Sequence, residues 1–303
     1  MKLFAITTVL LSLLPLTANA FLTYEEMQNK MLGLANKYSE RVTFFELTKS
    51  EDGTAVNGLY IKGENQKESI KQVVVGTHHG DEWGAAAVVL SFAEDIAQTP
   101  LIDRDVYVIP VLIPDAYRAD SRYYRGVNPN RDYPGPCGSH DGNDKLKPFS
   151  LKATYALSEL IRINNVVAAI TVHNPWGTVH YPWNDQRNTY TNDHVSFVKT
   201  YEDAYSGTDY KHGTVADLFY TMKGGFEDFV YWEYGVWGYL VEVGGGKKPS
   251  ESILMKETSI QLRAFRKILL NGPTIRSDQH SHPGCEQNNP LAALLYPYFE
   301  AQE

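Results

Sequence analysis

Short, predominantly apolar runs alternate along this chain with segments in which apolar residues recur at helical spacing. The apolar runs are residues 72–75, 106–112, 166–172 and 239–243. The segments with helical spacing are residues 24–37, 85–97, 151–163 and 260–270. Apolar runs of this kind predict strands buried on both faces, and strands that alternate with helices build mostly parallel sheets. We therefore expect an α/β fold with a mixed, mostly parallel central sheet and helices on both faces.

The organisation of the chain indicates one large domain. Its 303 residues are 43% hydrophobic and 21% charged, an ordinary globular composition, and no linker divides them. After Leu270 the helical spacing is lost and a polar tail follows. We expect a main domain over residues 21–272 and a C-terminal extension, residues 273–303, that packs on it. The net charge of -8 argues against nucleic acid as a partner.

Residues 1–20 have the pattern of a secretory signal peptide. Lys2 precedes an apolar run at residues 9–14, and Ala18-Asn19-Ala20 is a small-x-small sequence typical of signal cleavage. This run is too short to span a bilayer, and we expect no membrane span elsewhere. We therefore predict a secreted or periplasmic protein whose mature chain begins near Phe21.

Export bears on the two cysteines, Cys137 and Cys285. An oxidising compartment lets a disulfide persist, so these residues are candidates for one bond between the tail and a central loop. The sequence leaves open whether their Cα atoms lie within the roughly 7 Å that a disulfide requires. The tail histidines, His280 and His282, are expected to be solvated rather than part of a second metal site.

Side chains that can bind a metal follow two of the predicted strands. His79 and Glu82 come directly after one strand, and His173 ends another. The carboxyl ends of parallel strands meet at one edge of the sheet, so these side chains should lie close together. Two imidazoles and a carboxylate that leave one position open suit a catalytic zinc ion. The spacing from His78 to Glu82 would also serve, so these residues alone leave the register open.

These motifs resemble the zinc metallocarboxypeptidase family typified by pancreatic carboxypeptidases A and B, over nearly all of the chain from Leu22 to Leu270. The family's H-x-x-E-W motif is similar to residues 79–83, which favours His79 over His78. Its arginine-rich stretch ending in G-V-D-P-N-R resembles residues 122–131. The other matching residues are His173 with Tyr181-Pro182, and Tyr220 with Gly224, Gly225, Asp228 and Glu242.

The resemblance implies one zinc ion held by His79, Glu82 and His173. It further implies that Glu242 is the general base and then the general acid, taking a proton from the attacking water and delivering it to the leaving amine. Arg125 would stabilise the oxyanion of the tetrahedral intermediate.

The resemblance also implies how a substrate binds. Asn130 and Arg131 would hold the terminal carboxylate of a peptide or protein, because a guanidinium matches the planar geometry of a carboxylate, and Tyr220 would close over the substrate. Glu227 falls where the family sets the floor of its specificity pocket. A carboxylate there predicts a preference for basic C-terminal residues. The alternative is that Glu227 turns outward or pairs with a lysine such as Lys223.

Two departures from the family pattern leave other functions open. Asp81 stands where the pancreatic enzymes carry an arginine that holds the upstream part of the peptide, and Gly-Asp-Glu resembles relatives that act on bacterial cell-wall peptides. The predicted signal peptide leads almost directly into the domain, so we expect a member without a pro-domain. The alternative functions are a cell-wall peptide hydrolase that acts at diaminopimelate and a catalytically inactive peptide-binding relative.

Overall fold

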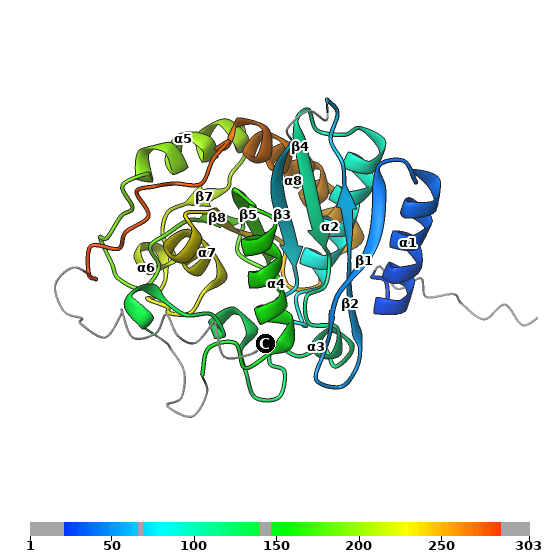
Figure 1. The fold of residues 1–303 in the computed structure, drawn as a ribbon, viewed down its shortest axis with the longest axis horizontal. Coiled ribbons are helices and arrows are strands. Elements are labelled where there is room, and N and C mark those ends of the chain that lie inside the picture. The colour runs from blue at the N-terminus through cyan, green and yellow to red at the C-terminus, as the bar shows by residue number, and fades with distance from the viewer. Residues whose placement is uncertain (1–20, 66–68, 140–146, 286–303) are drawn as a thin grey trace, which may run out of the picture.

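The computed structural model describes residues 21–65, 69–139 and 147–285, which contain eight strands and eight α-helices (Figure 1). The strands are β1 (Val42–Lys49), β2 (Ala55–Ile61), β3 (Ile70–Gly76), β4 (Arg104–Ile109), β5 (Ala168–His173), β6 (Thr178–His180), β7 (Lys211–His212) and β8 (Trp237–Glu242). The helices are α1 (Tyr24–Lys37), α2 (Trp83–Gln98), α3 (Pro114–Arg118), α4 (Lys152–Ile163), α5 (His194–Ala204), α6 (Val215–Leu218), α7 (Phe226–Tyr234) and α8 (Glu251–Asn271).

The eight strands form one mixed sheet in the order β1-β2-β4-β3-β5-β8-β6-β7. Its centre, β4-β3-β5-β8, is parallel, and these are the four strands that the apolar runs predict. Antiparallel pairing joins β1 to β2, β2 to β4, and β6 to β8. The predicted α/β fold with a mixed, mostly parallel sheet is therefore confirmed.

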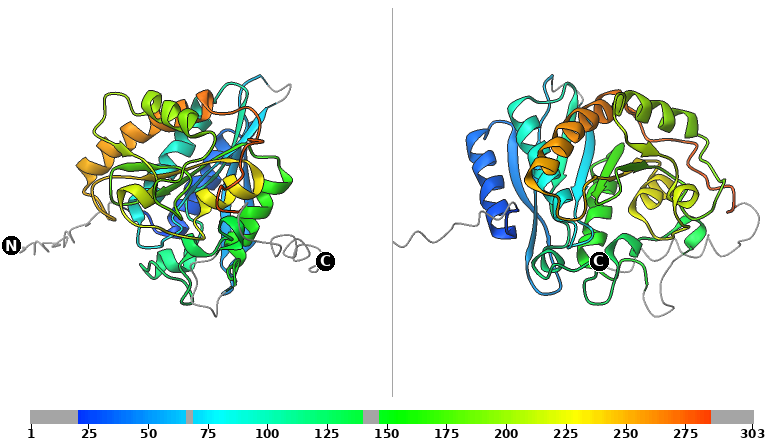
Figure 2. Two further views of the ribbon diagram at one scale, coloured as in Figure 1. Left: turned by 90° about the vertical axis from the view of Figure 1, so that its left-hand side faces the viewer. Right: turned by 180° about the vertical axis from the view of Figure 1, so that it is seen from behind.

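Helices cover both faces of the sheet. Helices α4 and α7 lie in front of it in Figure 1, and α8 comes to the front in the reversed view of Figure 2. Strand β3 shows why its sequence is apolar throughout. Val73 and Val75 join the core on the α4 and α7 side, whereas Val74 joins the core on the α1, α2 and α8 side. Successive side chains of a strand point to opposite faces, so a strand covered on both sides needs apolar residues at every position.

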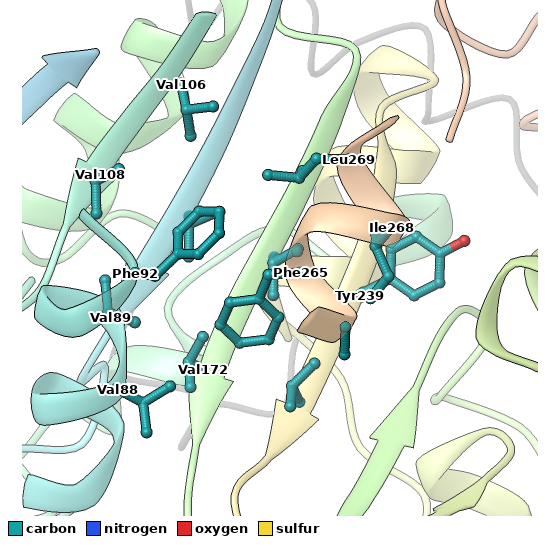
Figure 3. Packing of buried hydrophobic residues seen from close by; sticks show 14 of the residues in the cluster. Val88, Val89, Phe92, Val106, Val108, Val172, Tyr239, Phe265, Ile268 and Leu269 are labelled. Atoms are coloured by element: carbon teal, nitrogen blue, oxygen red, sulfur yellow. The ribbon is translucent and has the colours of Figure 1, made fainter. Parts of the chain in front are cut away.

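The larger core lies between the sheet and helices α2 and α8. Phe92 of α2 packs edge-on against Phe265 of α8, with ring centroids 5.5 Å apart, and both rings are fully buried (Figure 3). Val172, directly before His173, contributes to the same core. Removing a buried aromatic side chain of this kind costs about 3–5 kcal/mol. This packing holds the strand ends that carry the polar residues described below.

The described part of the tail, residues 273–285, runs along the domain surface. The main-chain N–H of Ser277 donates to the carbonyl of Gly235 over 2.7 Å. Cys137 and Cys285 form a disulfide, with their Cα atoms 5.1 Å apart. The predicted solvation of His282 is wrong, since its ring is 3% exposed and packs against Trp183.

Residues 1–20 and 286–303, where the predicted signal peptide and the end of the predicted extension fall, lie outside the described residues. None of the described helices has the length and apolar character that a membrane crossing requires.

Candidate metal centre and active site

The carboxyl ends of three central strands bring the polar residues together. His79 lies in the turn between β3 and α2, His173 is the last residue of β5, and Glu242 is the last residue of β8. Because β3, β5 and β8 are parallel neighbours, their carboxyl ends share one edge of the sheet.

Glu82 lies between two imidazole rings. Its Oε1 is 2.8 Å from Nδ1 of His79, and its Oε2 is 2.9 Å from Nδ1 of His173. The two Nδ1 atoms are 3.2 Å apart. All three side chains are buried, and their ligand atoms lie within 4.8 Å of one another, as a single metal ion requires.

The tautomer of His79 is consistent with metal binding. Its Nε2 donates to Oδ1 of Asn128 over 2.9 Å, which leaves a lone pair on the Nδ1 atom that faces Glu82. Burial lowers the pKa of His79 to about 4, so the ring is neutral near pH 7. Two imidazoles and one carboxylate therefore fit zinc. The sequence prediction missed Asn128, although it lies two residues before Asn130 in the arginine-rich motif.

The carboxylates of the site differ in electrostatic environment. Burial alone would raise the pKa of Glu82, but the adjacent rings of His79 and His173 outweigh burial and lower it. Burial and the nearby charge of Glu82 raise the pKa of Glu242 well above its usual range. The Oε2 atom of Glu242 is buried and has no hydrogen-bond partner among the described residues. Glu242 thus has an oxygen available to accept a proton.

A cavity of about 450 Å³ opens beside this cluster. The residues that line it include His79, His173, Glu242, Arg122, Asn130 and Arg131. Arg131 Nη2 donates to the hydroxyl of Tyr220 over 3.2 Å, and Tyr220 is 52% exposed. The predicted carboxylate-binding residues and the predicted cap therefore lie together at one cavity.

Arg125 is not brought to the cavity. Its side chain is 54% exposed and its Nη2 donates to Oδ1 of Asp52 over 2.7 Å. Arg125 and Gly126 both have positive φ angles, of 51° and 80°, in the turn between Tyr124 and Val127. Arg122 lies at the cluster instead, with Nη1 3.4 Å from Oε1 of Glu82. Arg122, and not Arg125, therefore lies beside Glu82 and lines the cavity.

Glu227 is fully buried, which excludes the alternative in which it turns outward. Its Oε1 accepts from Nδ2 of Asn184 over 2.9 Å, and its Oε2 has no hydrogen-bond partner among the described residues. Asp228, also buried, accepts from the same amide group over 3.0 Å. Burial raises the pKa of Glu227. It is not among the residues that line the cavity.

Asp81 does not present an unpaired charge to the site. Its Oδ2 forms an ion pair with Nζ of Lys247 in the segment that follows β8. The two side chains are 19% and 40% exposed, respectively.

The fold and the three-residue cluster are those of a single-metal hydrolase, in which one zinc ion activates a water. A comparison with protein families is more specific, because the zinc carboxypeptidase profile matches residues 27–264. The chain therefore belongs to the zinc carboxypeptidase family and is a zinc metallocarboxypeptidase, as the motifs predicted. The family implies zinc, and His79, Glu82 and His173 form a group that could hold it.

Several solved structures have a fold similar to that of this chain. Thrombin activatable fibrinolysis inhibitor has a TM-score of 0.76 and 18% identity, over 84% of this chain and 75% of that one. Carboxypeptidase A from Helicoverpa armigera has a TM-score of 0.70 and 15% identity, over 82% and 72%. Murein-tripeptide amidase from Escherichia coli O157 has a TM-score of 0.50 and 16% identity, over 76% and 92%. A comparison with curated protein sequences finds no match.

Proposed function

We propose that this protein removes the C-terminal residue of peptides by means of one zinc ion, with a preference for lysine or arginine at that position. The observation that carries the preference is Glu227, a fully buried carboxylate with an oxygen that lacks a hydrogen-bond partner among the described residues. A buried polar atom without a partner is costly, and a cationic side chain of the substrate would satisfy it.

The charges near Glu227 agree with a cationic ligand. Asp228 is adjacent, and both carboxyl groups share the amide of Asn184. Burial raises the pKa of Asp228 well above its usual range, and the charge of Glu227 raises it further. A cationic side chain bound beside Glu227 would favour the ionised form of these groups. The positive charge of Arg131 is close enough to lower the pKa of Glu227. In the bound complex, Arg131 would contact the terminal carboxylate of the substrate while the cationic side chain of the substrate contacts Glu227.

Peptide hydrolysis would use the side chains around the cavity as follows. A zinc ion held by His79, Glu82 and His173 would polarise the scissile carbonyl and lower the pKa of a water. Glu242 takes a proton from that water as the water oxygen bonds to the carbonyl carbon. It then delivers the proton to the amine as the carbon–nitrogen bond breaks.

Four side chains hold the substrate during this reaction. Arg122, in place of Arg125, stabilises the oxyanion. Asn130 and Arg131 bind the terminal carboxylate, and Tyr220 covers it.

The specificity is tested with a set of blocked dipeptides that differ only in a C-terminal Lys, Arg, Leu or Phe. The wild-type protein should have the highest kcat/KM on Lys and Arg. In Glu227→Gln, which keeps the shape and one acceptor oxygen but carries no charge, kcat/KM should fall about 10–100-fold on basic substrates and little on apolar ones. Equal losses on all four substrates would refute the assigned role of Glu227.

A cell-wall peptide that contains diaminopimelate is the second candidate substrate. The free amine of diaminopimelate could contact Glu227 in the same way, and a murein-tripeptide amidase has a similar fold. Products from a murein tripeptide and from a peptide ending in arginine, identified by mass spectrometry, separate the two. Cleavage of the murein peptide alone would favour the second candidate. A zinc-loaded protein that cleaves neither would favour an inactive peptide-binding relative.

We further propose that the protein acts outside the cytoplasm. The signal-like pattern of residues 1–20 and the Cys137–Cys285 disulfide support this location, because structural disulfides persist in oxidising compartments. N-terminal sequencing of protein recovered outside the cytoplasm should begin near Phe21, and recovery of an intact Met1 only from the cytoplasm would contradict export.

A further inference from the structure

His78 directly precedes the ligand His79 but does not join the metal cluster. Its Nδ1 lies 3.0 Å from Oγ1 of Thr171, and its Nε2 lies 2.9 Å from the hydroxyl of Tyr133. All three side chains are fully buried. Histidines that are adjacent in the sequence therefore have different surroundings, since His79 faces the other ligands whereas His78 is bonded within the protein interior.

Thr171 connects His78 to a predicted metal ligand. Its Oγ1 is 3.1 Å from Nε2 of His173, the ring nitrogen opposite the one that faces Glu82. To bind a metal through Nδ1, His173 must carry its proton on Nε2 and donate it to Thr171. His173 can donate to Thr171 whichever tautomer His78 adopts, because the hydroxyls of Thr171 and Tyr133 can each donate or accept a hydrogen bond.

Tyr133 anchors the far end of this chain in the core. Its ring packs against Phe226 and Phe229, with centroids 5.4 Å away in each case. The ring of His78 also stacks on His173, at 5.5 Å with a 16° angle between planes. Hydrogen bonds and stacking thus restrict both the tautomer and the tilt of the His173 ring.

We propose that Thr171, His78 and Tyr133 form a buried hydrogen-bonded chain that positions His173 for zinc, with Thr171 in direct contact with the ligand. The contact between Thr171 and Nε2 of His173 is the counterpart of the contact between Asn128 and Nε2 of His79. Each of the two histidines therefore has an oxygen acceptor at the ring nitrogen that faces away from Glu82. Such outer partners orient ligand rings and raise their basicity. The inference rests on the zinc site of the proposed function and is independent of substrate specificity.

Zinc affinity tests the role of Thr171 without a need for activity. Thr171→Val keeps the shape but removes the acceptor, and its zinc dissociation constant should rise about 10–100-fold in competition with a chromogenic chelator. Thr171→Ser retains the hydroxyl and should bind zinc nearly as the wild type does. Thr77→Val is the matched control, because the hydroxyl of buried Thr77 donates to the carbonyl of Pro110 over 2.8 Å rather than to a histidine of the cluster. Equal zinc affinity of Thr171→Val, Thr77→Val and the wild type would overturn the proposal.

A double-mutant cycle with His78→Phe tests whether the residues act as one chain. Phenylalanine keeps a ring beside Phe226 but removes both nitrogens. If His78 acts through Thr171, the double variant should bind zinc no more weakly than Thr171→Val alone. If the effects of the two substitutions on the zinc dissociation constant multiply instead, His78 does not act through Thr171. If His78→Phe does not fold, the Thr171→Val and Thr171→Ser pair still decides. A protein that binds zinc as expected yet cleaves no basic peptide would defeat the proposed function and leave this inference standing.

Discussion

His173 and Glu242 are register partners in the parallel pair of strands β5 and β8. Partner residues on neighbouring strands lie about 4.8 Å apart and point to the same face of the sheet. A metal ligand and the proposed general base are thus adjacent without any help from a loop. The sheet itself therefore sets the separation between His173 and Glu242.

This arrangement predicts that Glu242→Gln separates catalysis from metal binding. The variant cannot accept a proton from the attacking water, so kcat should fall about 10²–10⁴-fold or more. The zinc dissociation constant should change little, because Glu242 is not one of the three ligands. Steady-state kinetics and chelator competition on the same preparation measure both quantities. Substantial activity in a zinc-loaded Glu242→Gln protein would show that another group is the base.

The acid limb of the pH–rate profile should also depend on Glu242. Burial and the charge of Glu82 raise its pKa in the metal-free protein, and the bound cation would lower it. Only the ionised carboxylate can act as a base, so kcat/KM should rise with pH through the pKa of Glu242. An acid limb that is unchanged in a variant of the carboxylate, such as Glu242→Asp, would argue against this assignment.

Two arginines three residues apart offer a matched test of oxyanion stabilisation. Arg122→Ala should lower kcat about 10²–10³-fold, because its guanidinium lies beside the metal ligands. Arg125→Ala should lose the exposed contacts to Asp52 and to the ring of Tyr124, with kcat near that of the wild type. The reverse order of effects would restore the role that the sequence suggested for Arg125.

The sequence could predict the residues at the ends of strands but not those on the intervening loop. β3, β5 and β8 are covered on both faces, so their apolar runs reveal where they end and place His79, His173 and Glu242. Residues 122–125 read Arg-Tyr-Tyr-Arg, and nothing in this pattern says that Arg122 lies beside Glu82 whereas Arg125 pairs with Asp52. Backbone hydrogen bonds between Tyr124 and Val127 close the turn at residues 125–126, and the Arg125 side chain on it pairs with Asp52, some seventy residues earlier in the chain.

The strands at the sheet edges were missed for a related reason. β1 has only one fully buried residue, Val42, and its other positions are half-buried or exposed. It therefore shows no continuous apolar run. β7 has only two residues, which is too short for any periodicity to be visible. Helix α8 begins at Glu251, nine residues before the predicted start. In its first turns apolar residues such as Met255 lie at exposed positions, so the spacing of apolar residues there does not mark one buried face.

His180, on the cavity wall, should make the protein sensitive to acid. Its Nδ1 donates to the carbonyl of Gly213 over 3.0 Å, and its Nε2 lies 2.8 Å from Oγ1 of Thr178. Burial lowers its pKa from 6.5 to about 4. Between these values the unfolded state binds more protons, so this residue's contribution to stability is lost as pH falls, by about 3 kcal/mol in total.

The sensitivity can be measured by urea unfolding of the metal-free protein between pH 7 and pH 4. His180→Gln keeps a donor for Gly213 but does not titrate, so its unfolding free energy should fall less steeply with acid than that of the wild type. His280→Gln, which changes a partly exposed ring, is the control. Parallel pH profiles for His180→Gln and the wild type would contradict the prediction.

The Cys137–Cys285 disulfide should stabilise the tail and the region beneath it. It closes a loop with a sequence separation of 148 residues. Close to it, His282 packs on Trp183 with ring centroids 4.8 Å apart, and its Nε2 lies 3.1 Å from Oδ1 of Asp185.

Paired replacement of Cys137 and Cys285 by serine should lower the unfolding free energy by about 2–5 kcal/mol. The zinc dissociation constant should stay unchanged, because the disulfide and the His79, Glu82 and His173 cluster are separate groups in the described part of the chain. Reductant should lower the urea midpoint of the wild type but not that of the double variant, and a midpoint indifferent to reductant in both would show that the bond contributes nothing.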